Sequence, residues 1–395
     1  MSAIVLNSNA NSALINTINA SSSKMNPNVY SSPPIFPSSS TVWQKTESSS
    51  GSIGANNTLT FDLMKYGIAE QMLLCYTKDT NGTAAYDFLN VIERVELLSS
   101  SKVIDTLTNY DILALASDLD FSQYNTCNKS FIGARGAATS NLICVPLVFS
   151  FFKSVNTNLN LQFNEPMSVR VRFGAKINYG SAAANDSTLS SCYLRMRYKA
   201  YNEADYSEVL TQNYNESELN QLVRTMYDEN VVNTGTINAG ANNGDKGTPI
   251  ELKNTDCVNS FYVILRQVDA TKPTAPDAIS RIRFTASGQE IFDLSGEELF
   301  WSKLSMNGFS VRGSYDADKT GNVVKIQLGR YEYPALDTHQ TNTMSLRELN
   351  NPKIQVFFTN GSAANASFDI CVVEEALSIV STISSSGRVQ QSLSN

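Results

Sequence analysis

Apolar and polar positions alternate with a period of two along much of residues 145–173. Three runs follow one another there. Residues 146–152 are apolar at nearly every position, whereas 159–163 and 167–173 place apolar side chains at every second position. A period of two is typical of a strand with one buried face, and a short continuous apolar run is typical of a fully buried strand. The stretch therefore predicts three successive β-strands.

The same order of elements occurs a second time along the chain. Residues 92–112 align with 279–299 at a constant offset of 187, and the Asn-x-Pro phrase at Asn164 returns at Asn350, at an offset of 186. Five identities support the first alignment: Ile92 and Ile279, Arg94 and Arg281, Ser100 and Ser287, Ile104 and Ile291, Leu107 and Leu294. The two offsets are nearly equal, and two separate matches at nearly the same spacing indicate a duplicated domain.

Helical patterns are rare. Thr108 is a suitable cap for a short helix over residues 109–116. Residues 202–230 have the most helical pattern of the chain, with Ser217 as a potential cap and apolar side chains at helical spacing further on. We therefore expect a helical connector between the two copies.

These elements predict an all-β protein of two tandem eight-stranded antiparallel jelly rolls with short helices and long loops. An immunoglobulin-like sandwich is the alternative, but the uneven spacing of turns and long loops favours jelly rolls. The expected organisation is an extended N-terminal arm at 1–42, a first jelly roll at 43–205, a helical connector and loop at 206–247, a second jelly roll at 248–380 and a C-terminal tail at 381–395.

Composition changes this interpretation little. The chain is 42% hydrophobic and only 17% charged, with a formal net charge of −7. No run of Lys or Arg exceeds two residues, so we expect no direct binding of nucleic acid. The longest apolar run, 143–152, is half the length of a membrane span, and the first residues lack the basic start of a standard signal peptide. A soluble protein is expected.

Six cysteines occur, at positions 75, 127, 144, 192, 257 and 371, and none forms a CxxC pair. Four of them lie within apolar runs, where a free thiol packs as a small hydrophobic side chain. We therefore expect neither a metal site nor a disulfide framework, and a reducing compartment during folding.

Candidate catalytic and metal-binding residues are few. The single histidine, His339, lies in a polar loop, and no nucleophile motif such as GxSxG accompanies it. Asp316, Asp318 and Thr320 fall at the first, third and fifth positions of a calcium loop with Gly321 sixth. However, Gln327 occupies the twelfth position, where a bidentate Glu is needed, and a tight turn is the better interpretation.

Two further sets of charged residues stand out in the sequence. The adjacent carboxylates Glu297–Glu298 and Glu374–Glu375 are interpreted as solvated faces, because a glycosidase needs two carboxylates that face each other. A second set forms alternating basic faces on two strands, which serve either solubility or a charged subunit contact: Arg170, Arg172, Arg195, Arg197 and Lys199. The sequence thus predicts no catalytic, cofactor-binding or metal-binding residues, and no enzyme.

Several of these segments resemble a known family. PLVFSFF and LNLQFNEPMSVRVRF, within residues 146–173, resemble the central strands of double jelly-roll major capsid proteins. MSLRELNNPKIQVFF, at 344–358, resembles the corresponding segment of their second domain. The family spans tectivirus-like phages, adenoviruses, virophages, polinton-like viruses and large nucleocytoplasmic DNA viruses, and the resemblance covers roughly residues 42–385.

The resemblance implies a structural virion protein, made inside the host cell and located in the capsid shell. It implies a homotrimer that acts as a pseudo-hexagonal capsomer of an icosahedral double-stranded DNA virus, with neighbouring capsomers, penton proteins and minor capsid proteins as partners. It also implies that long loops at 113–142, 175–191 and 302–322 project as towers. No cofactor is implied.

Two alternatives stay open. One is a minor capsid or spike component. The other is a carbohydrate-binding or carbohydrate-active β-sandwich protein, which would need clustered aromatic side chains, whereas Trp43 and Trp301 are far apart in the sequence.

Overall fold

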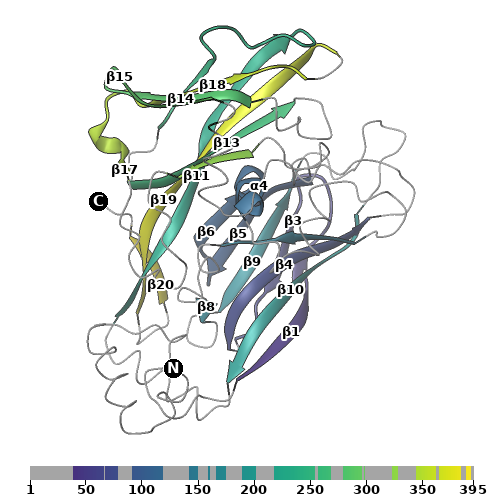
Figure 1. Cartoon of the computed structure of the whole chain (residues 1–395). Coiled ribbons are helices and arrows are strands. Elements are labelled where there is room, and N and C mark those ends of the chain that lie inside the picture. Colours follow the sequence, from purple (N-terminus) through teal and green to yellow (C-terminus); the bar gives the residue numbers. More distant parts are fainter. Residues whose placement is uncertain are drawn as a thin grey trace, which may run out of the picture.

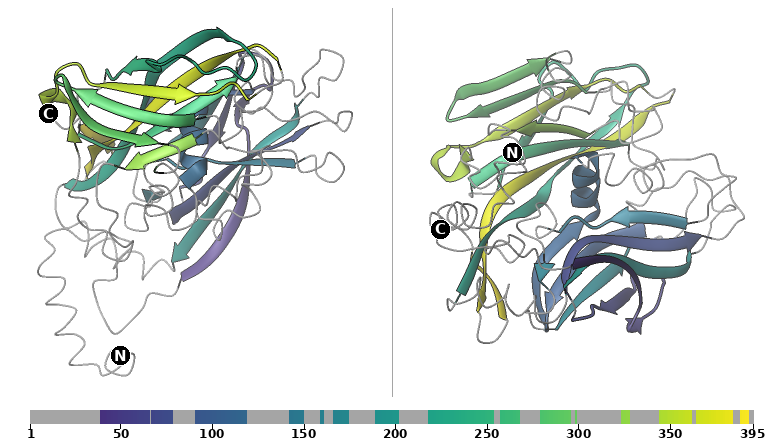
Figure 2. Two further views of the ribbon diagram at one scale, coloured as in Figure 1. Left: turned by 45° about the horizontal axis from the view of Figure 1, so that its top comes forward. Right: turned by 60° about the horizontal axis from the view of Figure 1, so that its bottom comes forward.

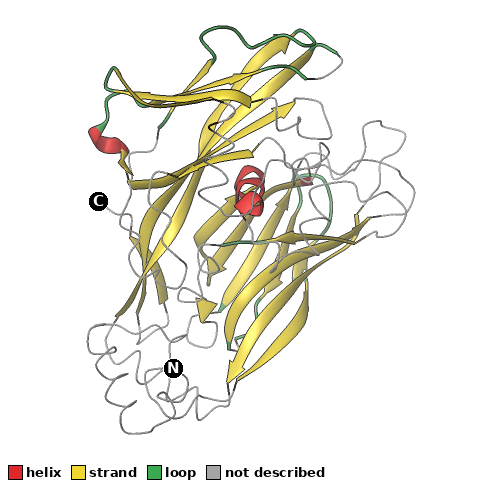
Figure 3. Cartoon of the chain, in the orientation of Figure 1, coloured by secondary structure: helices red, strands yellow, loops and turns green. Residues whose placement is uncertain are grey.

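The structure is a computed structural model. It describes residues 39–65, 67–78, 91–118, 142–149, 159–160, 166–174, 189–201, 218–253, 257–267, 279–295, 298, 323–327, 344–361, 364–383 and 388–392. Strands dominate these ranges, as Figure 3 shows. None of the helices in the described ranges is long and apolar enough to span a membrane.

Two antiparallel sheets form the first unit. Sheet I consists of β1 (Ser39–Glu47), β10 (Leu189–Tyr201), β4 (Ile68–Lys78) and β7 (Leu142–Pro146) in that order, with β8 (Leu159–Asn160) also paired to β4. Sheet II consists of β2 (Ser50–Gly51), β3 (Thr58–Asp62), β9 (Met167–Phe173), β5 (Ile92–Ser99) and β6 (Lys102–Thr108). Helix α4 (Asn109–Asp118) follows β6 directly.

Two further antiparallel sheets form the second unit. Sheet III consists of β11 (Glu218–Ile237), β19 (Ala366–Ile383), β13 (Cys257–Gln267) and β16 (Val323–Gln327), with β17 (Met344–Ser345) beside β13 and β20 (Arg388–Ser392) beside β19. Sheet IV consists of β12 (Thr248–Glu251), β18 (Lys353–Phe358), β14 (Ile279–Ala286) and β15 (Gln289–Ser295). A short 3-10 helix, η7 (Leu346–Glu348), lies between β17 and β18.

The strand order identifies both units as jelly rolls. Leaving aside the two-residue strands β2, β8 and β17 and the C-terminal strand β20, each unit has eight main strands among the described residues. In chain order within a unit, one sheet pairs the first, eighth, third and sixth strands, and the other pairs the second, seventh, fourth and fifth. This is the order of a jelly roll. The predicted fold class is confirmed.

The duplication extends to irregularities of the sheets. The β5–β6 pairing shifts register between Leu97 and Leu98, and the β14–β15 pairing shifts at the equivalent Phe284 and Thr285. Both hairpins turn through a serine with positive φ, 54° at Ser100 and 52° at Ser287. Bulges of this kind set the twist and register of a strand pair, so the 187-residue offset found in the sequence is confirmed at these hairpins.

The seventh strands are offset by 185 residues, one fewer than the Asn-x-Pro phrase. Ile92 is paired with Phe173, and its duplicate Ile279 is paired with Phe358. Each strand begins directly after its proline, and β18 is one residue shorter than β9, with six residues instead of seven.

The predicted helical connector is wrong over residues 218–237. This segment is the 20-residue strand β11, which is paired with β19 from end to end. Val, Thr and Ile are frequent in its second half and favour strand geometry, and pairing with a long partner strand outweighs the local helical spacing. The terminal segments were also misjudged, because β1 begins at Ser39, inside the expected arm, and β20 lies inside the expected C-terminal tail.

Three other expectations were only partly right. The strand predicted at residues 146–152 lies earlier in the chain, at Leu142–Pro146. Residues 147–149 are buried but are not in a strand. The expected loop at 113–142 begins inside α4, which confirms the short helix after Thr108, and the expected loop at 175–191 ends inside β10. The rest of these loops, all of 302–322 and residues 150–158 lie outside the described residues.

The two units pack closely. Sheet IV, sheet III, α4 with sheet II, and sheet I follow one another from the upper left to the lower right of Figure 1. Figure 2 shows from two other sides that sheet III and α4 lie between the outer sheets of the two units. The interior of the second unit, between sheets III and IV, is one core, and the interior of the first unit is another.

Val171 provides a test of the first core. It is fully buried in β9 between Leu59 of β3 and Val95 of β5. We expect Val171→Asp to abolish folding, because an unpaired charge would be buried, and Val171→Ala to cost about 2 kcal/mol in the free energy of unfolding. Urea denaturation followed by circular dichroism would measure both.

The neighbouring Arg172→Gln is the control. Arg172 points to the other face and pairs with Glu93 at a half-exposed position, so its loss should cost less than about 1 kcal/mol. A folded Val171→Asp variant of normal stability would contradict the register of β9.

Candidate functional site

The contact between the two units is a continuation of the first core. Four buried side chains from sheet III belong to the same apolar cluster as the interior of the first unit: Tyr262, Ile264, Cys371 and Val373. Met226 of β11 and Tyr110 of α4 pack against this cluster. One face of sheet III is thus buried against sheet IV, and the other is buried against the first unit.

A capping box begins α4 at this contact. The backbone N–H of Asp111 donates to Thr108 Oγ1 at 3.3 Å, and the backbone N–H of Thr108 donates to Asp111 Oδ2 at 2.9 Å. This reciprocal pair satisfies two donors at the start of the helix. The hydroxyl of Thr108 also donates to Asp228 Oδ2 of β11, so the cap links the two units directly.

One of these two hydrogen bonds recurs in the second copy. The backbone N–H of Ser295 donates to Glu298 Oε2 at 2.7 Å, and these residues are the duplicates of Thr108 and Asp111. Hydrogen bonds from Ser295 lower the pKa of Glu298 below its usual value. Glu298, expected on a solvated face, is indeed exposed.

Asp111 is buried in an acidic environment. Burial raises the pKa of its carboxyl well above the usual value, and the charge of Asp228 raises it further, with a small contribution from Asp105. The hydrogen bonds from Thr108 act in the opposite direction. Cys371 lies on β19, the strand paired with β11, and its thiol contacts the backbone oxygen of Asp228 at 3.6 Å. The pKa of this thiol is also raised, by burial first and then by Asp228 and Asp111.

The interpretation of Glu374–Glu375 as a solvated face is wrong. Both side chains are buried in β19. Glu375 accepts hydrogen bonds from the hydroxyls of Ser260 and Tyr262 of β13, whereas Glu374 accepts one from Asn230 of β11 at 2.7 Å. The two carboxylates have separate partners on opposite neighbouring strands. They do not face each other across an open site.

The basic faces of the first unit are ion-pair ladders. Arg94 and Arg170 both contact Glu96, Arg172 contacts Glu93, and Arg197 contacts Glu70 at 2.9 Å. The pairs are partly exposed, so each contributes little to stability. The basic faces were expected to serve solubility or a subunit contact, and these partners within the chain were not foreseen. Glu96 is 74 residues from Arg170, and Glu70 is 127 residues from Arg197. Arg195 is exposed.

Most other candidate residues lie outside the described part of the chain: Glu297, Asp316, Asp318, Thr320, Gly321 and His339. Gln327 ends strand β16. No group of three or more His, Cys, Asp or Glu side chains that could hold a metal ion occurs within the described ranges.

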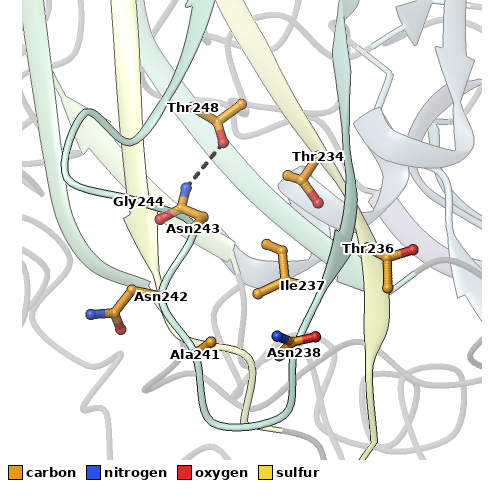
Figure 4. A pocket seen from close by; sticks show the side chains of 9 residues that line it. All are labelled: Thr234, Thr236, Ile237, Asn238, Ala241, Asn242, Asn243, Gly244 and Thr248. Atoms are coloured by element: carbon orange, nitrogen blue, oxygen red, sulfur yellow. Dashed lines mark hydrogen bonds between the residues drawn. The ribbon is translucent and has the colours of Figure 1, made fainter.

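A hollow of about 380 Å³ lies where β11 leads into β12 (Figure 4). Its polar groups serve the fold. Asn243 donates to Thr248 Oγ1 at 3.0 Å and to the backbone oxygen of Val356 at 2.8 Å, and accepts from the backbone N–H of Phe358. Asn243 therefore joins the β11–β12 connection to β18.

Two exposed surfaces of the described part of the chain are defined here, because each combines an apolar side chain with at least one charged side chain. The first, here called the β1–β10 face, consists of Trp43, Lys45, Tyr193 and Arg195 on the outside of sheet I. Trp43 is 48% exposed, and the ammonium of Lys45 lies 4.4 Å from the Tyr193 ring centroid. The second, here called the β15 edge, consists of Glu290 and Ile291. Ile291 is 41% exposed, whereas its duplicate Ile104 is only 3% exposed.

The burial of Asp111 beside Asp228 predicts that the stability of the protein depends on pH. A carboxyl whose pKa is raised by folding stabilises the protein at low pH, and this contribution is lost as pH rises through the raised pKa. We therefore expect Asp111→Asn to be more stable than the wild type near pH 8, with a difference that shrinks as pH is lowered towards 4. Thermal unfolding at a series of pH values measures this difference.

Asp105→Asn is the matched control, because Asp105 is the minor neighbour in the same strand–helix segment. Its effect should vary less with pH than that of Asp111→Asn. A difference for Asp111→Asn that grows towards low pH would contradict the raised pKa.

No family model matches the sequence, and no curated protein matches it. Solved structures do match. PBCV-1 VP54, in a structure fitted into a reconstruction of the virophage Sputnik, has a TM-score of 0.68 at 12% identity over 93% of this chain and 99% of that one. The mavirus major capsid protein has a TM-score of 0.61 at 12% identity, over 93% of this chain and 92% of that one.

A chain from the Sputnik virophage has a TM-score of 0.59 at 9% identity, over 92% of this chain and 90% of that one. Each of the three alignments covers more than nine-tenths of this chain, and therefore residues of both units. The chain therefore has the double jelly-roll fold of these viral capsid proteins.

Proposed function

We propose that the chain is a major capsid protein, a structural virion protein that forms trimeric, pseudo-hexameric capsomers in the icosahedral shell of a double-stranded DNA virus. The observation that carries this proposal is the fixed pair of duplicated jelly rolls. A buried contact joins them, and both have the same strand order and the same bulged hairpin, β5–β6 in the first and β14–β15 in the second. Three such chains around a threefold axis present six similar lobes, which suit a hexagonal lattice.

The contact inside the chain suggests how neighbouring chains meet. Strand β6 and α4 of the first jelly roll contact the outer face of sheet III. The duplicate of β6 is β15, and the counterpart of sheet III is sheet I. We propose that the β15 edge of one chain docks on the β1–β10 face of the next, so that Ile291 becomes covered as Ile104 is covered within the chain.

Position supports this pairing. Lys45 and Glu290 are each paired within the chain, with Glu47 and Arg283, so the docking rests on the exposed apolar side chains Trp43 and Ile291. Figure 1 shows β1 and β15 at opposite ends of the molecule. Two complementary surfaces at opposite ends generate a head-to-tail contact, which closes into a ring when the rotation between chains allows it.

The remaining parts of the proposal follow from this role. The jelly-roll units are proposed to span 39–201 and 218–392, with residues 202–217 as the link. The partners are further copies in neighbouring capsomers, penton proteins at the vertices and minor capsid proteins. The net charge of −7 supports a shell that does not neutralise nucleic acid directly. The location is the virion, after assembly in the host cell.

Multi-angle light scattering of the purified full-length chain tests the assembly. We expect a mass three times the 43.3 kDa of one chain. Ile291→Asp and Trp43→Asp should each weaken association at least tenfold, because each places a carboxylate in an apolar contact whose loss costs about 2 kcal/mol. Their circular dichroism spectra should match that of the wild type.

Val103→Asp is the control, since Val103 is exposed to a similar degree but belongs to neither surface. This variant should remain trimeric. A monomeric wild-type chain at high concentration would contradict the capsid proposal. A wild-type trimer that Ile291→Asp and Trp43→Asp leave intact would contradict only the proposed docking.

A further inference from the structure

Two cysteines of sheet I lie side by side on neighbouring strands. Cys75 of β4 is directly opposite Cys144 of β7, and their sulfur atoms are 3.2 Å apart. Neither cysteine is part of a disulfide. We propose that these two thiols are a redox site, which closes to a cross-strand disulfide when the protein meets a low-molecular-weight disulfide such as oxidised glutathione. This inference does not depend on the proposed function.

The backbone already holds the two residues in place. Leu74 and Val145 are paired on one side of the cysteines, and Tyr76 and Ile143 on the other, without a register shift. Opposed residues in antiparallel strands have Cβ atoms roughly 4.5–5.5 Å apart, close to the spacing that a disulfide needs. Closing the bond brings the sulfur atoms about 1 Å closer, which small side-chain rotations can provide.

The environment of the pair differs from both protein cores. Leu73, Cys75, Cys144 and Tyr193 form a separate cluster on the outside of sheet I. Lys45 lies over the Tyr193 ring, and Arg195 is its neighbour along β10. Burial and the two nearby thiols raise the pKa of Tyr193, whereas Arg195 and Lys45 lower it.

Two other described cysteines have the opposite environment. Cys192 points into the first core, where burial and Glu47 raise the pKa of its thiol to about 12. Cys371 is buried at the contact between the units, where burial and three aspartates raise its thiol pKa. Thiols of this kind are inert to disulfide exchange, so the oxidant should select the Cys75–Cys144 pair.

Burial also assigns an order to the reaction. Cys144 is partly exposed, whereas Cys75 is fully buried. The Cys144 thiolate attacks one sulfur of the oxidant, a mixed disulfide forms, and one thiolate leaves and takes up a proton. The Cys75 thiolate then attacks Cys144 Sγ and expels the second thiolate. In total, the two protein thiols lose two electrons and two protons, and one oxidant molecule becomes two thiols.

The bond would close the chain over residues 75–144 and fix β7 to β4. Cross-links over long loops stabilise the folded state most. The site would stay reduced in the cytosol and close in an oxidising medium outside the cell. The protein would then be more resistant to unfolding in an oxidising medium than in a reducing one.

The test uses the full-length protein, incubated with oxidised glutathione and then alkylated. Peptide mapping by mass spectrometry without reductant should find one linked peptide pair that contains Cys75 and Cys144. The midpoint of thermal unfolding should rise by about 5 °C and return to its original value after treatment with dithiothreitol.

Three variants make the test specific. Cys144→Ser should show neither the linked peptides nor the rise, and its partly exposed position tolerates the change. Cys75→Ala should give the same result as Cys144→Ser. If Cys75→Ala does not fold, the result for Cys144→Ser alone tests the proposal. Cys192→Ala is the matched control and should respond as the wild type does. Persistent free thiols at both positions, or a linkage of either residue to another cysteine, would overturn the proposal.

Discussion

The burial of both faces of sheet III is the constraint on which the rest of the structure depends. One face packs on sheet IV and the other extends the first core through Tyr262, Ile264, Cys371 and Val373. A sheet in this position cannot tolerate charge on either side unless the charge is hydrogen-bonded. Glu374 and Glu375 meet this condition through Asn230, Ser260 and Tyr262. The two jelly rolls are therefore held as one body by an apolar contact with a few fixed polar links.

The polar links make the contact specific. Apolar packing alone would accept small rotations of one jelly roll against the other, whereas the bond from Thr108 to Asp228 requires one position. Buried hydrogen-bond networks commonly trade some stability for such uniqueness. The raised pKa of Asp111 shows the cost, because its carboxyl is held in surroundings that disfavour its charge.

Sequence patterns predicted the parts of this fold that depend on local alternation. Strand β9 and the two bulged hairpins were evident because their apolar periodicity and their repeat spacing are both local signals. Strand β11 was misjudged because its structure depends on pairing with β19, more than a hundred residues later. The carboxylates of β19 were misjudged for a similar reason, since charge is usually a sign of exposure and their partners come from distant strands. The approach of Cys75 to Cys144 depends on the register of β4 against β7, which no motif encodes.

The contact between the jelly rolls also affects how easily a ring can close. In a six-lobed ring of three chains, three of the six lobe–lobe contacts are made within a chain, where the chain itself keeps the two surfaces together. Such a contact forms at an effective concentration of roughly millimolar or higher, set by the tether and not by the amount of protein in the cell. Three chains then need only two associations that overcome the entropy of bringing free molecules together, whereas six separate lobes would need five. Duplication of the jelly roll thus lowers the protein concentration at which a hexagonal unit can assemble.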